Sequence, residues 1–140
     1  MKNEDAALIV RGILSLNRRL RAERPPGSVS LSALGILGTL RRKGPMPAAR
    51  LAVEENLQPQ SLTRLLASLE EDGLIERTTG VTDRREKLVA LTEHGRAMLV
   101  ADIDARSLWL SLAIADLEPQ ERDTLLQAAM LMAKLAERAD

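Results

Sequence analysis

Three consecutive charged residues, Asp83, Arg84 and Arg85, stand in a glycine-containing loop between two apolar segments, 74–75 and 88–91. Apolar residues on both sides of such a loop predict a two-stranded hairpin with a basic tip. Arginine guanidinium groups can donate hydrogen bonds to phosphate oxygens and to base edges. A hairpin that presents them on a small scaffold suits contact with a nucleic-acid groove, so nucleic-acid binding is the first hypothesis.

The helix predicted before this hairpin begins near Pro59 and ends at Asp72-Gly73. Its buried face is marked by four leucines, Leu62, Leu65, Leu66 and Leu69. Gln60 and Arg64 lie opposite that face, in the first half of the helix. Arginine can form two hydrogen bonds with guanine, and glutamine can form two with adenine. Gln60 and Arg64 are therefore predicted to read bases.

The flanks of the same helix carry short hydroxyl side chains, which can donate hydrogen bonds to phosphate oxygens. With two basic residues of the hairpin they complete the predicted DNA-binding set, which is Gln60, Ser61, Thr63, Arg64, Ser68, Arg84 and Lys87. A solvated face is the alternative interpretation for an isolated amphipathic helix. The short helix expected before it and the hairpin after it favour DNA readout, because that order is typical of a winged helix-turn-helix.

Apolar periodicity and capping residues predict further helices around these two elements. They cover residues 6 to about 22, Ser30 to about 43, 48–55, 92 to about 115, and 120–139. The order is four helices, a hairpin and two helices. This order predicts a mainly α fold with one small β-hairpin.

The predicted architecture is a winged helix-turn-helix core flanked by N- and C-terminal dimerisation helices. We expect the N-terminal dimerisation helix within residues 1–29, the DNA-binding domain at 30–92 and the C-terminal dimerisation helices at 93–140. The outer helices are long and rich in Leu and Ala, yet they have too little core of their own to close over. Pairing with a second identical chain would cover them, so a homodimer is expected.

The composition excludes several kinds of chemistry. The 140 residues include no cysteine, which excludes disulfides, thiolate nucleophiles and thiol redox sensing. With a single histidine, His94, no histidine-rich metal site is expected, and neither a metal nor a cofactor is predicted. No glycine-rich phosphate loop or nucleophile–base pair is visible, so enzymatic activity is the weakest interpretation.

The formal net charge is zero, which argues against a nonspecific nucleic-acid coat protein. It is compatible with a sequence-specific binder, because local placement of Arg and Lys decides that function. No apolar run reaches the roughly 18 residues that suggest a membrane span, and the N-terminus lacks the features of a signal peptide. We therefore expect no membrane association and residence in the cytoplasm.

Several short motifs together resemble the multiple-antibiotic-resistance regulator (MarR) family over nearly the whole chain. They are Leu37-Gly38-Thr39-Leu40, Gly44-Pro45-Met46, Leu51-Ala52, Leu62-Thr63-Arg64-Leu65, Leu69-Glu70, Gly73-Leu74-Ile75-Glu76-Arg77, Asp83-Arg84-Arg85 and Leu91-Thr92-Glu93-His94-Gly95-Arg96. The most specific part is Asp83-x-Arg85 followed by Leu91-Thr92. The resemblance implies a homodimeric winged-helix transcriptional repressor or activator that binds an inverted-repeat, pseudo-palindromic operator in double-stranded DNA.

The resemblance also implies roles for single residues. Asp83 and Arg85 would structure the wing, and Arg84 would point to the minor groove. Pro47 stands where the family often has a Ser or Thr cap, so this chain departs from the family pattern in the cap hydrogen bond, while proline still suits a helix start. Small molecules often bind such proteins between the dimer region and the winged helix, and the effector expected here is a small apolar or anionic molecule.

Two functions from different classes remain open at this point. The leading one is a DNA-binding transcriptional regulator. The predicted contacts Gln60, Arg64, Arg84 and Lys87 favour it over the alternative. The other is a winged-helix protein-interaction module that has lost DNA binding, which the zero net charge keeps in consideration. A gel-shift experiment against the region upstream of the gene separates the two.

Overall fold

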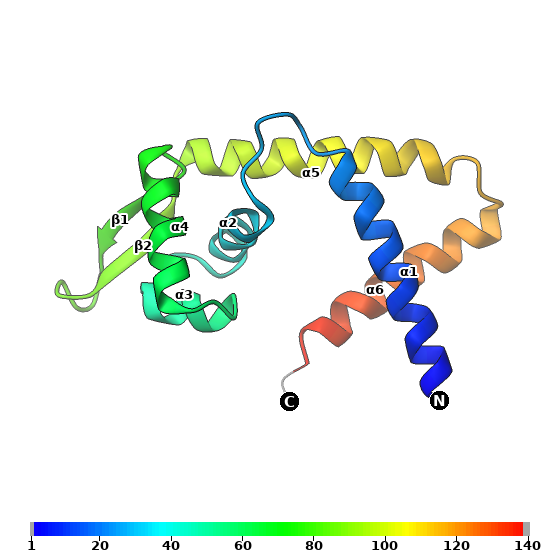
Figure 1. The fold of residues 1–140 in the computed structure, drawn as a ribbon, viewed down its shortest axis with the longest axis horizontal. Coiled ribbons are helices and arrows are strands. Elements are labelled where there is room, and N and C mark those ends of the chain that lie inside the picture. The colour runs from blue at the N-terminus through cyan, green and yellow to red at the C-terminus, as the bar shows by residue number, and fades with distance from the viewer. Residues whose placement is uncertain (1, 139–140) are drawn as a thin grey trace. The chain divides into compact units, whose positions relative to one another are not determined.

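The computed structural model describes residues 2–138, which fold into six α-helices and a two-stranded antiparallel hairpin (Figure 1). In chain order the elements are α1 (Asn3–Ala22), α2 (Leu31–Lys43), α3 (Ala48–Glu54), α4 (Pro59–Glu71), β1 (Ile75–Thr79), β2 (Lys87–Leu91), α5 (Glu93–Ile114) and α6 (Pro119–Ala136). The predicted mainly α class with one small hairpin is confirmed. The expected end of the last helix at Ala139 lies outside the described residues, and α6 ends at Ala136.

Packing divides the chain into two compact units, Arg24–Ala105 and the pair of segments Met1–Glu23 and Arg106–Asp140. Helix α5 contributes residues to both. The first unit contains α2, α3, α4 and the hairpin, and the second contains α1 and α6. The functional boundaries expected at residues 29/30 and 92/93 stay a prediction.

The core of the first unit is made of aliphatic side chains from every one of its elements. Its most deeply buried members include Ile36 and Leu37 of α2, Leu51 of α3, Leu66 of α4 and Val89 of β2. Leu66 lies on the face of α4 that the leucine spacing predicts. The core holds α3 and α4 in the relative positions of a helix-turn-helix.

Local capping explains where the helices of this unit begin and end. The Ser30 side chain accepts a hydrogen bond from the Ala33 N–H at 3.2 Å, as expected for the N-cap of α2. Pro47 stands at the N-cap of α3 and forms no side-chain cap hydrogen bond, which is the difference from the family pattern that the sequence indicated. Asn56, with φ of 51°, forms the turn between α3 and α4, and Gly73, with φ of 73°, follows α4.

The hairpin pairs Ile75 with Leu91 and Thr79 with Lys87 in an antiparallel register. A third segment joins it, because the Met46 N–H donates to the Val89 carbonyl at 3.2 Å and the Val89 N–H donates to the Met46 carbonyl at 2.8 Å. This bridge attaches the wing to the loop between α2 and α3. It was not predicted, since one bridging residue leaves no periodic signal in the sequence.

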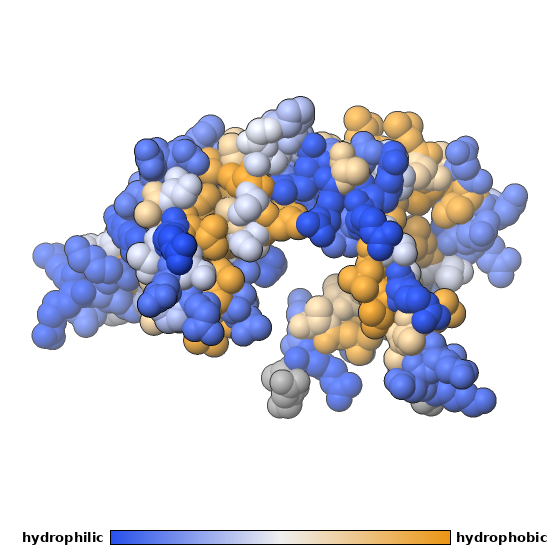
Figure 2. All heavy atoms as spheres, in the orientation of Figure 1, coloured by the Kyte–Doolittle hydropathy of each residue, from blue (hydrophilic) through white to orange (hydrophobic). Residues whose placement is uncertain are grey.

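The second unit has little interior of its own. No described residue of α1 or α6 is buried, and large apolar side chains stand in solvent, among them Leu8, Leu14, Leu112, Met130 and Leu135. Figure 2 shows apolar atoms on the surface over these helices. A groove of about 530 Å³ between α1, α5 and α6 is lined almost entirely by aliphatic residues. A single chain therefore leaves a large apolar surface uncovered.

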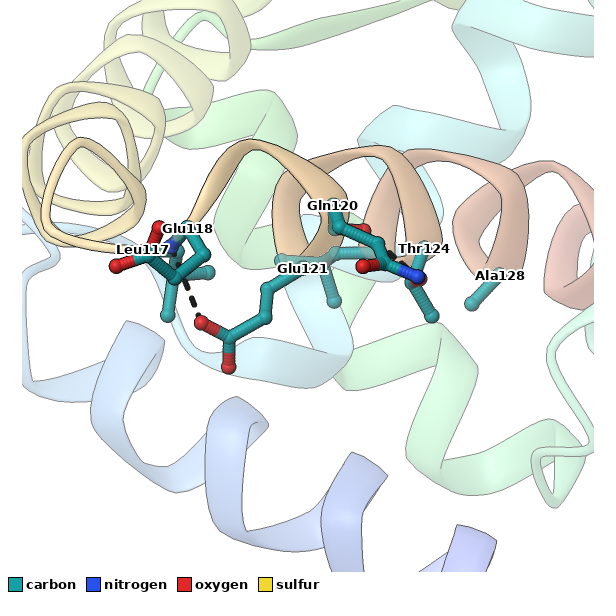
Figure 3. Close-up of a pocket in the computed structure, with 7 residues that line it drawn as sticks. Leu117, Glu118, Gln120, Glu121, Thr124 and Ala128 are labelled. Carbon is teal, nitrogen blue, oxygen red and sulfur yellow. Dashed lines mark hydrogen bonds between the residues drawn. The ribbon is translucent and has the colours of Figure 1, made fainter.

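A hollow of about 650 Å³ lies beside the first turns of α6 (Figure 3). Some of its polar groups take part in hydrogen bonds of the helix itself. The Glu118 N–H donates to Glu121 Oε1 at 3.0 Å, and the Thr124 hydroxyl donates to the Gln120 carbonyl at 2.9 Å. These bonds start the helix after the turn at Asp116 and Leu117. No helix within residues 2–138 is long and apolar enough to cross a membrane.

Candidate nucleic-acid interface

Helix α4 separates its apolar and polar residues as the sequence predicts. Leu62, Leu66 and Leu69 are buried, and Leu65 packs against the same core. The five predicted contact residues of this helix, Gln60, Ser61, Thr63, Arg64 and Ser68, are all exposed. The helix therefore offers a polar surface that a DNA groove could meet, while its leucines fix its orientation.

The hydrogen-bonding groups of these side chains are not equally available. The Thr63 hydroxyl donates to the Pro59 carbonyl at 2.8 Å, one turn earlier, so it must give up that bond before it can donate to phosphate. Arg64 makes no hydrogen bond or ion pair with any residue in the described part of the chain. Its guanidinium therefore keeps all its donors for another molecule.

Two side-chain hydrogen bonds connect α2 to the C-terminal end of α3. The buried Thr39 hydroxyl donates to the Glu55 carboxylate, and Arg42 donates to the Thr39 oxygen at 3.3 Å. Lys43 donates to Glu54 at 2.6 Å, and this bond is the main cause that lowers the pKa of Glu54. These contacts restrain α3 and therefore the start of α4.

The tip of the wing is held by hydrogen bonds between its own residues. The Gly80 N–H donates to the Glu86 carbonyl at 2.9 Å, and the Glu86 N–H donates to the Asp83 carbonyl at 3.1 Å. The Asp83 carboxylate accepts from the Arg85 N–H at 2.9 Å. A Cβ atom on residue 80 would lie 2.6 Å from the Asp83 carbonyl oxygen, so only glycine fits this turn without a shift.

The basic residues of the wing differ in their intramolecular partners. Arg84 and Lys87 are exposed and form no ion pair among residues 2–138. Arg85 is 96% exposed, with Nε 3.6 Å from Asp83 Oδ1. Arg77 of β1 lies 3.5 Å from Glu70 of α4 and is thereby partly neutralised. The cations with no carboxylate partner coincide with two of the predicted DNA contacts.

Several residues that shape this surface were not singled out from the sequence. Gly80 and Thr39 act through contacts with residues distant in the fold or in the turn, which a periodic pattern cannot reveal. A partly buried ion pair, Arg24 with Asp102 at 2.7 Å, connects the segment before α2 to α5, and Arg24 also donates to the Val29 carbonyl at 2.6 Å. An arginine next to a Pro-Pro-Gly turn was the only available signal for that pair.

Comparison with known proteins agrees with this geometry. Residues 29–87 match the model of the MarR family. An HTH-type transcriptional regulator of Mycobacterium bovis, Mb0904, is 39% identical over 91% of this chain and 89% of its own length. The HTH-type transcriptional repressor MdtR of Bacillus subtilis is 29% identical over 80% of this chain and 70% of its own.

The three-dimensional comparison extends over the whole chain. The crystal structure of a transcriptional regulator from Pseudomonas aeruginosa superimposes with a TM-score of 0.84 and 33% identity, covering 99% of this chain and 100% of the other. Sequence motifs, fold and relatives point in one direction. The chain belongs to the MarR family of winged helix-turn-helix transcriptional regulators.

Proposed function

We propose that this protein is a homodimeric transcriptional repressor that binds an inverted-repeat operator in double-stranded DNA. Base readout is assigned to Gln60 and Arg64, and phosphate contacts to Ser61, Thr63 and Ser68. Arg84 enters the minor groove and Lys87 contacts the backbone. The proposal contains no enzymatic step.

The observation that carries the proposal is the free guanidinium of Arg64 on the exposed face of α4. It lies beside Gln60 on a helix whose other face is locked into the core by Leu62, Leu66 and Leu69. A guanidinium on a rigid helix can form a bidentate pair with guanine, which discriminates against other bases by about 1–3 kcal/mol. A residue placed only for solubility would not need this rigid support.

The dimer is supported by the apolar surface of α1, α5 and α6. Covering exposed side chains such as Leu8, Leu112 and Met130 removes apolar area from water, which favours association. Two-fold symmetry would then place two copies of α4 about 10 bp apart along the duplex. The repressor assignment is supported by the similarity to MdtR, whose name describes a repressor.

The proposal includes release from DNA by a small apolar or anionic molecule. The chain has no cysteine, so oxidation of a thiol is not the trigger. A thermal-shift screen of hydrophobic carboxylic acids, followed by operator binding with each stabilising compound, tests this part. A compound that raises the melting temperature and weakens operator binding supports release by an effector.

The main test is binding to the DNA upstream of the gene, measured by fluorescence anisotropy with a scrambled duplex as control. The substitution Arg64→Ala should cost about 1–3 kcal/mol on the operator and little on the scrambled duplex. Arg122→Ala, an exposed arginine of α6, is the matched control and should change neither. Equal losses on both duplexes would mean that Arg64 contacts only phosphate.

The same experiment addresses the alternative function, a winged-helix module that binds protein instead of DNA. The zero net charge is the observation that favours it. If the wild-type chain binds operator and scrambled duplexes equally weakly at low salt, the DNA-binding proposal fails.

A further inference from the structure

The start of α5 meets the end of α4 at a tightly packed point, the 92–95 joint, which we define as Thr92, Gly95 and the Gly73-Leu74 turn. The Thr92 hydroxyl donates to the Gly73 carbonyl at 2.6 Å. The same oxygen accepts from the Gly95 N–H at 3.0 Å. One side chain therefore caps α5 and at the same time connects it to the turn that follows α4.

Backbone hydrogen bonds connect the start of β1 and the end of β2 to the 92–95 joint. The Thr92 N–H donates to the Leu74 carbonyl at 3.2 Å, and the Leu74 N–H donates to the Leu69 carbonyl at 2.9 Å. Leu74 precedes β1 directly, and Leu91 is the last residue of β2. The 92–95 joint thus connects α4, the wing and α5 through main-chain atoms.

Gly95 is the closest contact of the joint. A Cβ atom on residue 95 would lie 2.1 Å from the Leu74 carbonyl oxygen and 3.0 Å from the Leu74 carbonyl carbon. Real Cβ atoms do not approach backbone so closely, so any side chain at this position forces α5 and the Leu74 turn apart. Glycine is therefore required by the distance between two elements, since its φ is not in the left-handed region.

Helix α5 begins at the 92–95 joint and is continuous to Ile114, beyond the end of the winged-helix unit at Ala105. In the proposed dimer, α5 is the helix that links the winged-helix unit to the pairing helices, so a change at this joint would change how α4 is held relative to its symmetry mate. The distance between the two α4 helices must match the distance between the two half-sites of the operator.

We propose that the 92–95 joint determines which half-site spacing the protein recognises, with Gly95 and Thr92 as positioning residues that touch no DNA. This inference rests on the proposed function. It assigns operator spacing to the contact between α4 and α5, whereas base identity is read by the outer face of α4.

The test uses full-length protein and a series of duplexes in which the spacing of the two half-sites changes in steps of 1 bp around the natural value. Each duplex and a single half-site are titrated by fluorescence anisotropy. Gly95→Ala should lose about tenfold in affinity at the natural spacing, similar to one mismatched base pair. Its affinity for the single half-site should change little, so its preferred spacing shifts or disappears.

A second variant covers the case in which Gly95→Ala does not fold. Thr92→Val keeps the shape of the side chain but loses both hydrogen bonds of the hydroxyl, and it should also weaken the preference for the natural spacing. Thr92→Ser keeps both bonds and should restore it. Gly38→Ala on α2 is a glycine control, because a Cβ there would meet only the end of the Arg42 side chain, at 3.4 Å.

The outcomes separate the inference from the function beneath it. A variant that is merely less stable loses active protein and therefore loses affinity for every duplex by one factor. If Gly95→Ala and Thr92→Val keep the wild-type order of spacings, the inference is wrong while the proposed function stands. If the wild-type protein has no preferred spacing at all, both are wrong.

Discussion

At the wing, the shorter contact of the Asp83 carboxylate is with the backbone amide of Arg85. Asp83 accepts from the Arg85 N–H at 2.9 Å, whereas the two side chains are 3.6 Å apart and mostly solvent-exposed. Exposed ion pairs contribute about 0–1 kcal/mol, whereas an Asp side chain that accepts from the amide two residues later closes the turn locally. The amide bond is independent of the side chain at position 85, so the resemblance-based role of Arg85 stays a prediction.

This geometry makes a distinct prediction for Asp83. Asp83→Asn keeps an oxygen acceptor for the Arg85 amide and should leave hydrogen exchange in the free wing close to that of the wild type. Asp83→Ala removes the acceptor and should accelerate exchange in the wing and weaken DNA binding. Arg85→Ala should leave exchange in the wing unchanged. Equal acceleration by Arg85→Ala and Asp83→Ala would show that the ion pair braces the wing after all.

Arg84, between these two residues, should affect DNA alone. Arg84→Ala should change thermal stability by less than about 0.5 kcal/mol, because the side chain is exposed and unpaired. It should weaken operator binding and lower the salt dependence by about one phosphate contact. Titrations at several salt concentrations measure both effects. An unchanged affinity at low salt would remove Arg84 from the interface.

Among the elements, α3 shows how charge supports the helix-turn-helix. The hydrogen bond from Lys43, followed by the charges of Lys43, Arg50 and Arg42, lowers the pKa of Glu54 in the folded protein, against a smaller opposing effect of burial. A carboxyl group whose pKa is lower when folded stabilises the fold above its unfolded pKa, and this contribution is lost as pH falls through the folded value.

The substitution Glu54→Gln tests this contribution. At neutral pH it should lower the melting temperature slightly, because the bond lies at the surface and solvent screens it. Below the folded pKa, wild type and variant should melt at the same temperature, since both side chains are then neutral. Thermal melts between about pH 3 and pH 7 provide the measurement. A difference that persists in acid would point to packing as its cause.

Several boundaries could be predicted because their causes are local, whereas α1 begins at Asn3, before the expected start at residue 6. Ser30 caps α2, Pro59 begins α4 and Thr92 caps α5 at the residues where the sequence places them. The Met46–Val89 bridge and the close approach of Gly95 to Leu74 could not be predicted, since each depends on where a distant segment lies. The buried face of α4 can be predicted from the spacing of its leucines. That Arg64 has no hydrogen-bond or ion-pair partner among the described residues could be found only from the structure, because it depends on which residues lie near it in space.

At the scale of the whole molecule, α1, α5 and α6 leave many large apolar side chains exposed to solvent. The groove between these helices includes Ile9, Ile13, Leu110, Leu125 and Met132. A stable fold rarely leaves so much aliphatic surface in water, and a second copy of the same chain would cover it with a complementary surface. The state in which the protein binds DNA should therefore be a dimer at all working concentrations.

Removing the segment from Glu118 to the C-terminus is the direct test of this dimer. The shortened chain should be monomeric or aggregated in analytical ultracentrifugation, because α1 and α5 lose their helical partner. Its operator affinity should fall toward that of a single winged helix, since two half-sites can then no longer be bound as one unit.

A milder variant, Leu126→Asp, places a charge on an exposed apolar position of α6 without shortening the chain and should dissociate the dimer in the same assay. Arg122→Ala on the same helix is its control and should remain dimeric. A soluble, well-folded monomer of Leu126→Asp that bound the operator with wild-type affinity would contradict the requirement for two copies.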